Sequence, residues 1–233
     1  MVRIRPHLER QIEMNMLIAQ EGLTNDYGAT IGKILYQNGK TGIKDKLKAF
    51  AAAGSDARMS GCELPVCIIS GSGNQGITAS VPVVVYAKEN GIDKEKMLRA
   101  VLVSDLVTIH QKTGIGTLSA YCGAISAGVG AGAGICYLRG GSYHTIAHTI
   151  VNAVAILSGT ICDGAKPSCA AKIAMAVEAG LIGCEMASAK KQFYGGDGIV
   201  TKGVENTIRN VGLLARDGMS TTDKEIIKIM LGK

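Results

Sequence analysis

Three cysteine residues have the chemistry and the placement to form a functional site. Cys162 and Cys169 stand at the two ends of a turn-forming segment, and Cys122 lies upstream in a glycine-rich apolar stretch. Three thiolates can hold an iron–sulfur cluster and leave one iron without a protein ligand, and an open coordination position separates catalytic from structural metal sites. Free cysteine is also one of the most buried residue types. The trio is therefore either a metal centre or a set of small core residues.

The helices expected around these cysteines favour the metal interpretation. Cys169 is expected in the first turn of a helix over 169–190, where free backbone N–H groups and the helix dipole lower the pKa of a thiol. Cys122 is expected near the start of another helix, and Cys162 at the end of a helix over 144–161. No CxxC pair is present, so spacing alone leaves both interpretations open.

The glycine-rich segment 70–76, with the sequence SGSGNQG, is a second candidate site. A turn of this kind followed by a helix presents backbone N–H groups to an anion, although a simple polar loop has the same composition. Arg58 can bind a substrate carboxylate or pair with Asp56. The substrate-binding candidates are Ser70, Ser72, Asn74, Gln75 and Arg58.

Three residues are candidates for a general base. His110 and Lys112 lie near the end of an expected helix, and His144 is followed at helical spacing by His148. The histidine pair can also be structural, because no Glu-x-x-His arrangement accompanies it. The sequence does not choose among these residues.

The elements that must position these residues are mostly helices. Apolar periodicity and glycine punctuation predict one compact domain over 1–233, mainly α, with Gly/Ala-rich buried helices. Residues 64–70 are expected to form a short strand or a buried extended piece, and Thr117 or Ser119 to cap the glycine-rich helix that ends near Leu138. The other expected helices span 6–21, 26–37, 42–53, 94–111, 204–216 and 223–230.

Composition excludes several classes of protein. The net charge is +6, but no Lys/Arg cluster with interleaved aromatic residues occurs, so no nucleic-acid partner is expected. The uncharged stretch 120–138 is near the length of a membrane span, but it is mostly Gly, Ala and Ser and fits a buried helix better. The first residues lack the apolar core of a signal peptide, and an odd count of seven cysteines argues against disulfides. We therefore expect a cytoplasmic protein without a membrane anchor.

Several segments resemble the α-chain domain of iron–sulfur L-serine dehydratases, and more closely its L-cysteine desulfidase branch. The similarity covers nearly the whole chain, and the three-cysteine pattern is its most specific part. The matching segments are 55–59 (SDARM), 70–76 with 80–82, 118–123 (LSAYCG) and 159–169.

The resemblance implies a 4Fe-4S cluster bound by Cys122, Cys162 and Cys169, with no pyridoxal phosphate. It implies a lyase that eliminates the β-substituent of a small amino acid, either L-cysteine, giving pyruvate, ammonia and sulfide, or L-serine. The open iron would act as a Lewis acid on the β-group.

Full-length desulfidases carry a further N-terminal region that this sequence lacks. Either a second chain supplies that region, or this sequence is a fragment, or the protein is a shortened relative. We also expect a homo-oligomer. A non-catalytic cluster-binding or redox-sensing protein is the alternative from another class of function.

Overall fold

The computed structural model describes residues 3–36, 42–116 and 119–233. Within these ranges the chain is helical and forms one compact body, as the sequence predicts, and its only β-type pairings are two isolated bridges. The elements are α1 (Arg5–Thr24), α2 (Ile31–Tyr36), α3 (Ile43–Met59), α4 (Gly73–Glu89), α5 (Lys94–Ile115), α6 (Gly123–Leu138), α7 (Tyr143–Ile156), α8 (Cys169–Ser188), α9 (Val204–Leu213), a short π-helix η2 (Leu214–Gly218) and α10 (Thr222–Met230).

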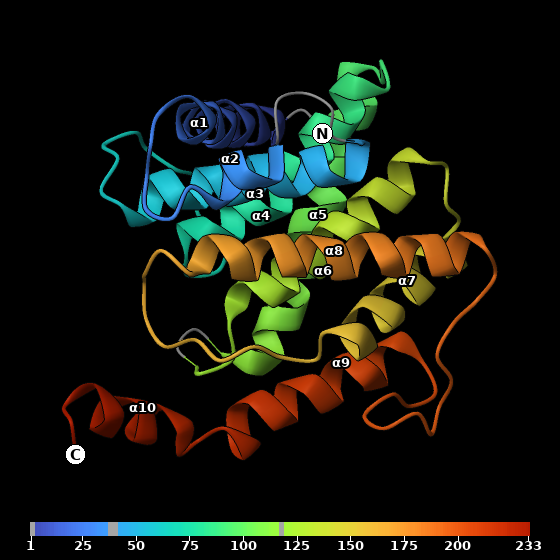
Figure 1. Ribbon diagram of the computed structural model, residues 1–233. Helices are drawn as coiled ribbons and strands as arrows, with labels where there is room; N and C mark the ends of the chain where they lie inside the picture. The colour runs from blue at the N-terminus through green and yellow to red at the C-terminus, as the bar shows by residue number, and fades with distance from the viewer. Residues whose placement is uncertain (1–2, 37–41, 117–118) are drawn as a thin grey trace.

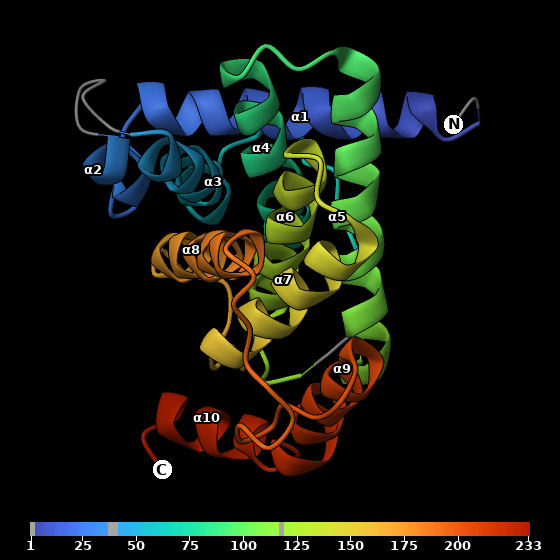
Figure 2. The same ribbon diagram turned by 90° about the vertical axis from the view of Figure 1, so that its right-hand side faces the viewer.

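The glycine-rich helix α6 lies at the centre of the body. Almost all of its residues are buried, and it packs against α4, α5, α7 and α8. Figures 1 and 2 show α1 at one end of the molecule, α8 passing across α6, and α9 with α10 at the opposite end. Burial of α6 confirms that the uncharged stretch belongs to a protein core. In the described part of the chain, no helix combines the length and apolar character needed to cross a bilayer.

Glycine residues bring α6 and α8 into backbone contact. A Cβ atom on Gly132 would lie 2.5 Å from the Gly180 carbonyl oxygen, and one on Gly180 would lie 2.2 Å from the Gly128 carbonyl oxygen. Real Cβ atoms do not approach so closely, so side chains here would force the helices apart. Since α6 begins just after Cys122 and α8 begins at Cys169, this contact also sets how the two helix starts face each other.

Several expectations about local structure are wrong. The helix expected over 26–37 begins only at Ile31. Residues 64–70 form neither the strand nor the buried extended piece, because the segment makes only an isolated bridge between Ile69 and Ser72, and Ile69 alone in it is buried. The helix expected over 42–53 continues to Met59, since small residues let it pack tightly against its neighbours. The helix expected to reach residue 161 ends at Ile156, so Cys162 lies in a loop.

The expected capping of α6 also differs. Ser119 does not cap this helix, because its hydroxyl accepts a hydrogen bond from the Tyr121 backbone N–H at 3.0 Å. The alternative cap, Thr117, lies outside the described residues. Cys122 itself occupies the N-cap position of α6 and makes no side-chain capping bond.

Candidate functional site

The three cysteines line one cavity of about 250 Å³. They reach it from the start of α6, from the loop between α7 and α8, and from the first residue of α8. Side chains from α3, α4 and α5 complete the wall. The polar residues that share the cavity with the cysteines are Arg58, Ser72, Asn74, Gln75, Lys112, Ser119 and Tyr121.

A pair of backbone hydrogen bonds fixes Cys122 and Cys162 relative to each other. The Cys122 N–H donates to the Thr160 carbonyl at 2.8 Å, and the Cys162 N–H donates to the Ala120 carbonyl at 2.6 Å. They form an isolated antiparallel bridge between Tyr121 and Ile161. The loop that follows α7 therefore returns to the start of α6, which the helix expected over 144–161 did not anticipate.

The third cysteine is the first residue of α8, as the sequence predicts. The Cys169 thiol lies 3.6 Å from the carbonyl oxygen of Gly164, within the same loop. Lys172, one helical turn further on, donates to the Ile161 carbonyl and to Asp163, both at 2.7 Å. Lys172 was not predicted from the sequence as a residue that fixes this loop, although a lysine one turn after a cysteine at a helix start could have indicated it.

The thiols of Cys122 and Cys162 form a coupled pair. The pKa of Cys162 is lowered to about 6 because it accepts a hydrogen bond from Cys122, with further help from the Gly164 N–H and from Lys172 and Lys112. The pKa of Cys122 is raised, because it donates that hydrogen bond and because it is buried. One thiolate is therefore favoured at neutral pH, and a thiolate is the form that binds metals.

Arg58 and Asn74 place a cationic wall opposite the thiols. The Arg58 guanidinium donates to the Asn74 side-chain oxygen at 3.3 Å and, within the described part of the chain, pairs with no carboxylate. Burial lowers the pKa of Arg58, an effect opposed by the nearby Cys169. Asp56 does not pair with Arg58, because its carboxylate accepts the Gly32 N–H at 2.8 Å and so holds α2.

The glycine-rich segment is shorter as a loop than the sequence predicts. Its second half is the first turn of α4, where the Ser72 hydroxyl accepts the Gln75 N–H at 3.4 Å. The Gln75 amide packs against Gly123, where a Cβ atom would lie 1.8 Å from its nitrogen, and its side-chain oxygen is buried without a hydrogen-bond partner among the described residues. Ser70 has a φ of 47° and lies outside the cavity lining.

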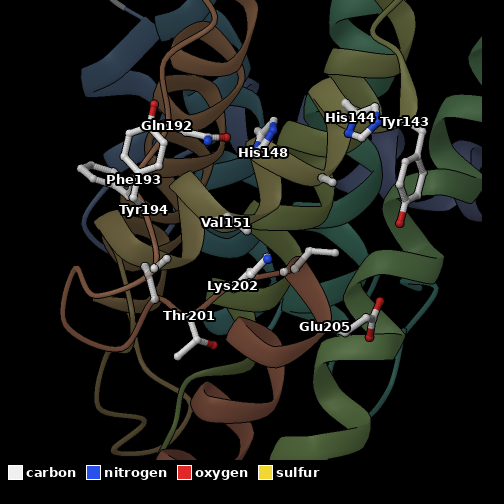
Figure 3. Close-up of a pocket in the computed structure, with 15 residues that line it drawn as sticks. Tyr143, His144, His148, Val151, Gln192, Phe193, Tyr194, Thr201, Lys202 and Glu205 are labelled. Atoms are coloured by element: carbon white, nitrogen blue, oxygen red, sulfur yellow. The ribbon is translucent and has the colours of Figure 1, made fainter.

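Of the three candidate bases, only Lys112 lies at this cavity. It is 4% exposed, and its ammonium group has no hydrogen bond or ion pair within the described residues. Burial lowers its pKa, although the neighbouring thiols of Cys122 and Cys162 oppose the effect. His110 instead contacts Glu205 at 2.6 Å on the surface, and His144 lines a different cavity, shown in Figure 3.

Comparison with known proteins identifies relatives of this chain and a family model that matches it. Relatives include UPF0597 proteins from Desulfitobacterium hafniense, 60% identical over 230 residues, and Lachnoclostridium phytofermentans, 54% identical over 228 residues. The matches cover 99% and 98% of this chain but 54% and 55% of those proteins, so the chain spans about half the length of these curated relatives. No solved structure matches significantly. The family model described as "Serine dehydratase alpha chain" matches residues 1–228. The chain therefore belongs to the serine dehydratase alpha-chain family.

Proposed function

We propose that this chain is the cluster-bearing part of an iron–sulfur lyase that eliminates the β-thiol of L-cysteine and yields pyruvate, ammonia and sulfide. One observation carries the proposal. Cys122, Cys162 and Cys169 line one cavity together with Arg58 and the buried Lys112, and neither of these two cations forms an ion pair with a described residue. Membership of the serine dehydratase alpha-chain family supports lyase chemistry at such a site.

The donor set suits a cluster better than a closed single-metal site. Thiolates are the usual ligands of iron–sulfur clusters. Within the described residues, no three His, Cys, Asp or Glu side chains lie close enough to hold a metal ion, so the fit to a cluster rests on the chemistry of the three thiols and on the room around them. A cluster is bulkier and needs room between its ligands, and the wall here is built partly from Gly123, Gly164 and Ala165. At Gly164, with a φ of 100°, the space where a Cβ would stand is open.

In this proposal Cys122, Cys162 and Cys169 would hold a 4Fe-4S cluster, which would supply Lewis-acid activation of the substrate β-group. The Arg58 guanidinium binds the substrate carboxylate, and Asn74 orients it through the 3.3 Å hydrogen bond. Neutral Lys112 takes the α-proton onto Nζ, and burial favours that neutral form. The Cα–H electron pair forms the new double bond as the β-sulfur leaves as sulfide. The resulting aminoacrylate then hydrolyses to pyruvate and ammonia in water.

L-Serine is the second candidate substrate. The same steps eliminate a hydroxyl group, with water as the leaving group, and the name of the family model favours this substrate. The two reactions share pyruvate and ammonia as products, but only the cysteine reaction releases sulfide.

The rest of the active protein is also part of the proposal. The curated relatives are about twice as long as this chain, so we propose that a further polypeptide region, in cis or as a second chain, completes the site. We place the assembly in the cytoplasm, where free thiols persist.

The first test is the iron and acid-labile sulfide content of anaerobically purified protein, compared with Cys162→Ser, Cys169→Ser and the control Cys62→Ser, a residue outside the cavity. We expect roughly four iron and four sulfide per wild-type chain and per control chain, as for a cubane cluster, and a loss in the two site variants. Wild-type protein without iron after anaerobic reconstitution would refute the cluster. Pyruvate and sulfide assays with both amino acids, on the chain alone and on a full-length relative, then separate the substrates.

A further inference from the structure

A second cavity, of about 670 Å³, lies between α7, the loop after α8 and the start of α9. Figure 3 shows side chains from these three segments pointing toward one another. None of its lining residues lines the cysteine cavity. Its volume falls in the range of about 300–1,000 Å³ that is usual for small-molecule sites.

Uncompensated hydrogen-bond donors and positive charge face this cavity. The Lys202 ammonium has no ion pair within the described part of the chain, and Figure 3 shows it in the middle of the cavity. His144 and His148 stack on each other with ring centroids 6.5 Å apart, and neither ring makes a hydrogen bond to a described residue. Among the described residues that line the cavity, Glu205 is the one with an acidic side chain, and it contacts His110 at 2.6 Å. The groups left free are those that bind an anion.

Aromatic rings form a second part of the wall. Phe193 and Tyr194 stand on one side of Lys202 in Figure 3, and Tyr143 stands on the other. Tyr143 and Tyr194 are 75% and 63% exposed, and the Tyr143 ring lies edge-on to His144 with centroids 5.9 Å apart. Exposed aromatic faces beside a cation are suited to a planar ring that also carries negative charge.

Two buried polar side chains hold this wall in place. Asn152, which is fully buried, accepts the Phe193 N–H at 3.0 Å and donates to the Lys191 carbonyl at 3.2 Å. Thr207, also fully buried, accepts the Thr201 N–H at 3.3 Å and donates to the Thr201 carbonyl at 3.1 Å. The backbone on either side of the ligand space is therefore fixed before any ligand arrives, which reduces the entropy lost on binding.

We propose that this cavity is a binding site for a small anion bearing a planar ring, of the nucleoside-monophosphate type. Lys202 and the His144–His148 pair contact the anionic group, and the ring stacks on Phe193 or Tyr194. The site is separate from the cysteine cavity, so its occupancy can be measured without any catalytic assay.

The test is isothermal titration calorimetry of the purified chain with adenosine 5′-monophosphate, adenosine and inorganic phosphate. We expect the monophosphate to bind at least tenfold more tightly than either of its parts, because each part meets only half of the site. Lys202→Ala is expected to weaken monophosphate binding roughly tenfold, the usual effect of losing a charged hydrogen bond. Phe193→Leu, which keeps an apolar side chain, is expected to weaken it roughly threefold or more.

Lys224→Ala is the matched control, because it removes the same charge from an exposed position on α10. Circular dichroism of each variant checks that it is folded. Absence of binding at millimolar monophosphate would overturn the proposal, and so would equal affinities in Lys202→Ala and Lys224→Ala. If inorganic phosphate bound as tightly as adenosine 5′-monophosphate, the site would not recognise the ring and the proposal would be refuted.

Discussion

Replacing Asp105 by asparagine tests how the buried charge of α5 affects the stability of the fold. The Asp105 side chain is 7% exposed and accepts a hydrogen bond from the Gln11 amide at 3.0 Å. Burial raises its pKa to about 7, although the Gln11 hydrogen bond acts in the opposite direction. Asparagine keeps the shape and the acceptor for Gln11 but cannot ionise.

The size of the effect follows from the two pKa values. The folded value of about 7 stands about three units above the ordinary value of 3.8. At about 1.4 kcal/mol per unit, the ionised carboxylate costs on the order of 4 kcal/mol above pH 7. Because the folded state binds the proton more tightly, stability is highest below the unfolded pKa and falls as pH rises toward 7. Between pH 5 and pH 8, wild-type protein should lose about 2.5 kcal/mol through this residue.

The assay is urea unfolding at pH 5 and pH 8 for wild-type protein, Asp105→Asn and Asp223→Asn. The last variant is the control, because Asp223 is exposed on α10. Asp105→Asn should show a smaller loss of stability at pH 8 and become more stable than wild type there, while the control should follow wild type. The reasoning would be refuted if the free energy of unfolding of Asp105→Asn fell between pH 5 and pH 8 as much as that of wild type, or if the variant were less stable than wild type at pH 8.

Three further predictions concern the cysteine cavity and its supports. Lys112→Met should lower kcat for pyruvate formation by about 100-fold or more while leaving iron content unchanged; an unchanged kcat would remove this residue from proton transfer. Asn74→Ala should raise KM several-fold with little change in iron content, and equal KM values would exclude it from substrate binding. Gly132→Ala should destabilise the protein by about 1–3 kcal/mol in urea unfolding because its Cβ meets α8. Gly42→Ala, at the N-cap of α3 where the space for a Cβ is open, should cost less than Gly132→Ala, and equal stabilities of the two variants would contradict the packing argument.

Much of the helical framework was predictable because its signals are local. The helix expected to start at residue 94 does start there, and Asp93 caps it by accepting the Lys96 N–H at 2.9 Å. The helix boundaries that the sequence did not predict depend on contacts between residues that are distant in sequence. The loop after Ile156 is held by bonds to residues 120–122, and no local pattern near it encodes that pairing.

The part of the candidate site that the sequence predicted also depends on local signals. Cys169 was expected at a helix start, and it stands there. His110 and Lys112 were equal candidates, although residues two apart project from different sides of a helix. Only packing of α5 against α6 decides which of them reaches the cavity. Ser70 was a predicted substrate-binding residue only because it belongs to the glycine-rich segment. Its positive φ turns the chain just before α4 begins, so Ser70 does not line the cavity.

The reciprocal bridge between Tyr121 and Ile161 gives the site two built-in reporters. The amide protons of Cys122 and Cys162 are the donors of its two hydrogen bonds, so both become free to exchange with solvent deuterium only when the bridge opens. The Cys169 amide instead bonds to Lys166 within the turn that begins α8. Deuterium uptake should therefore report two separate openings. One frees the amides of Cys122 and Cys162 together, and the other frees the amide of Cys169 alone.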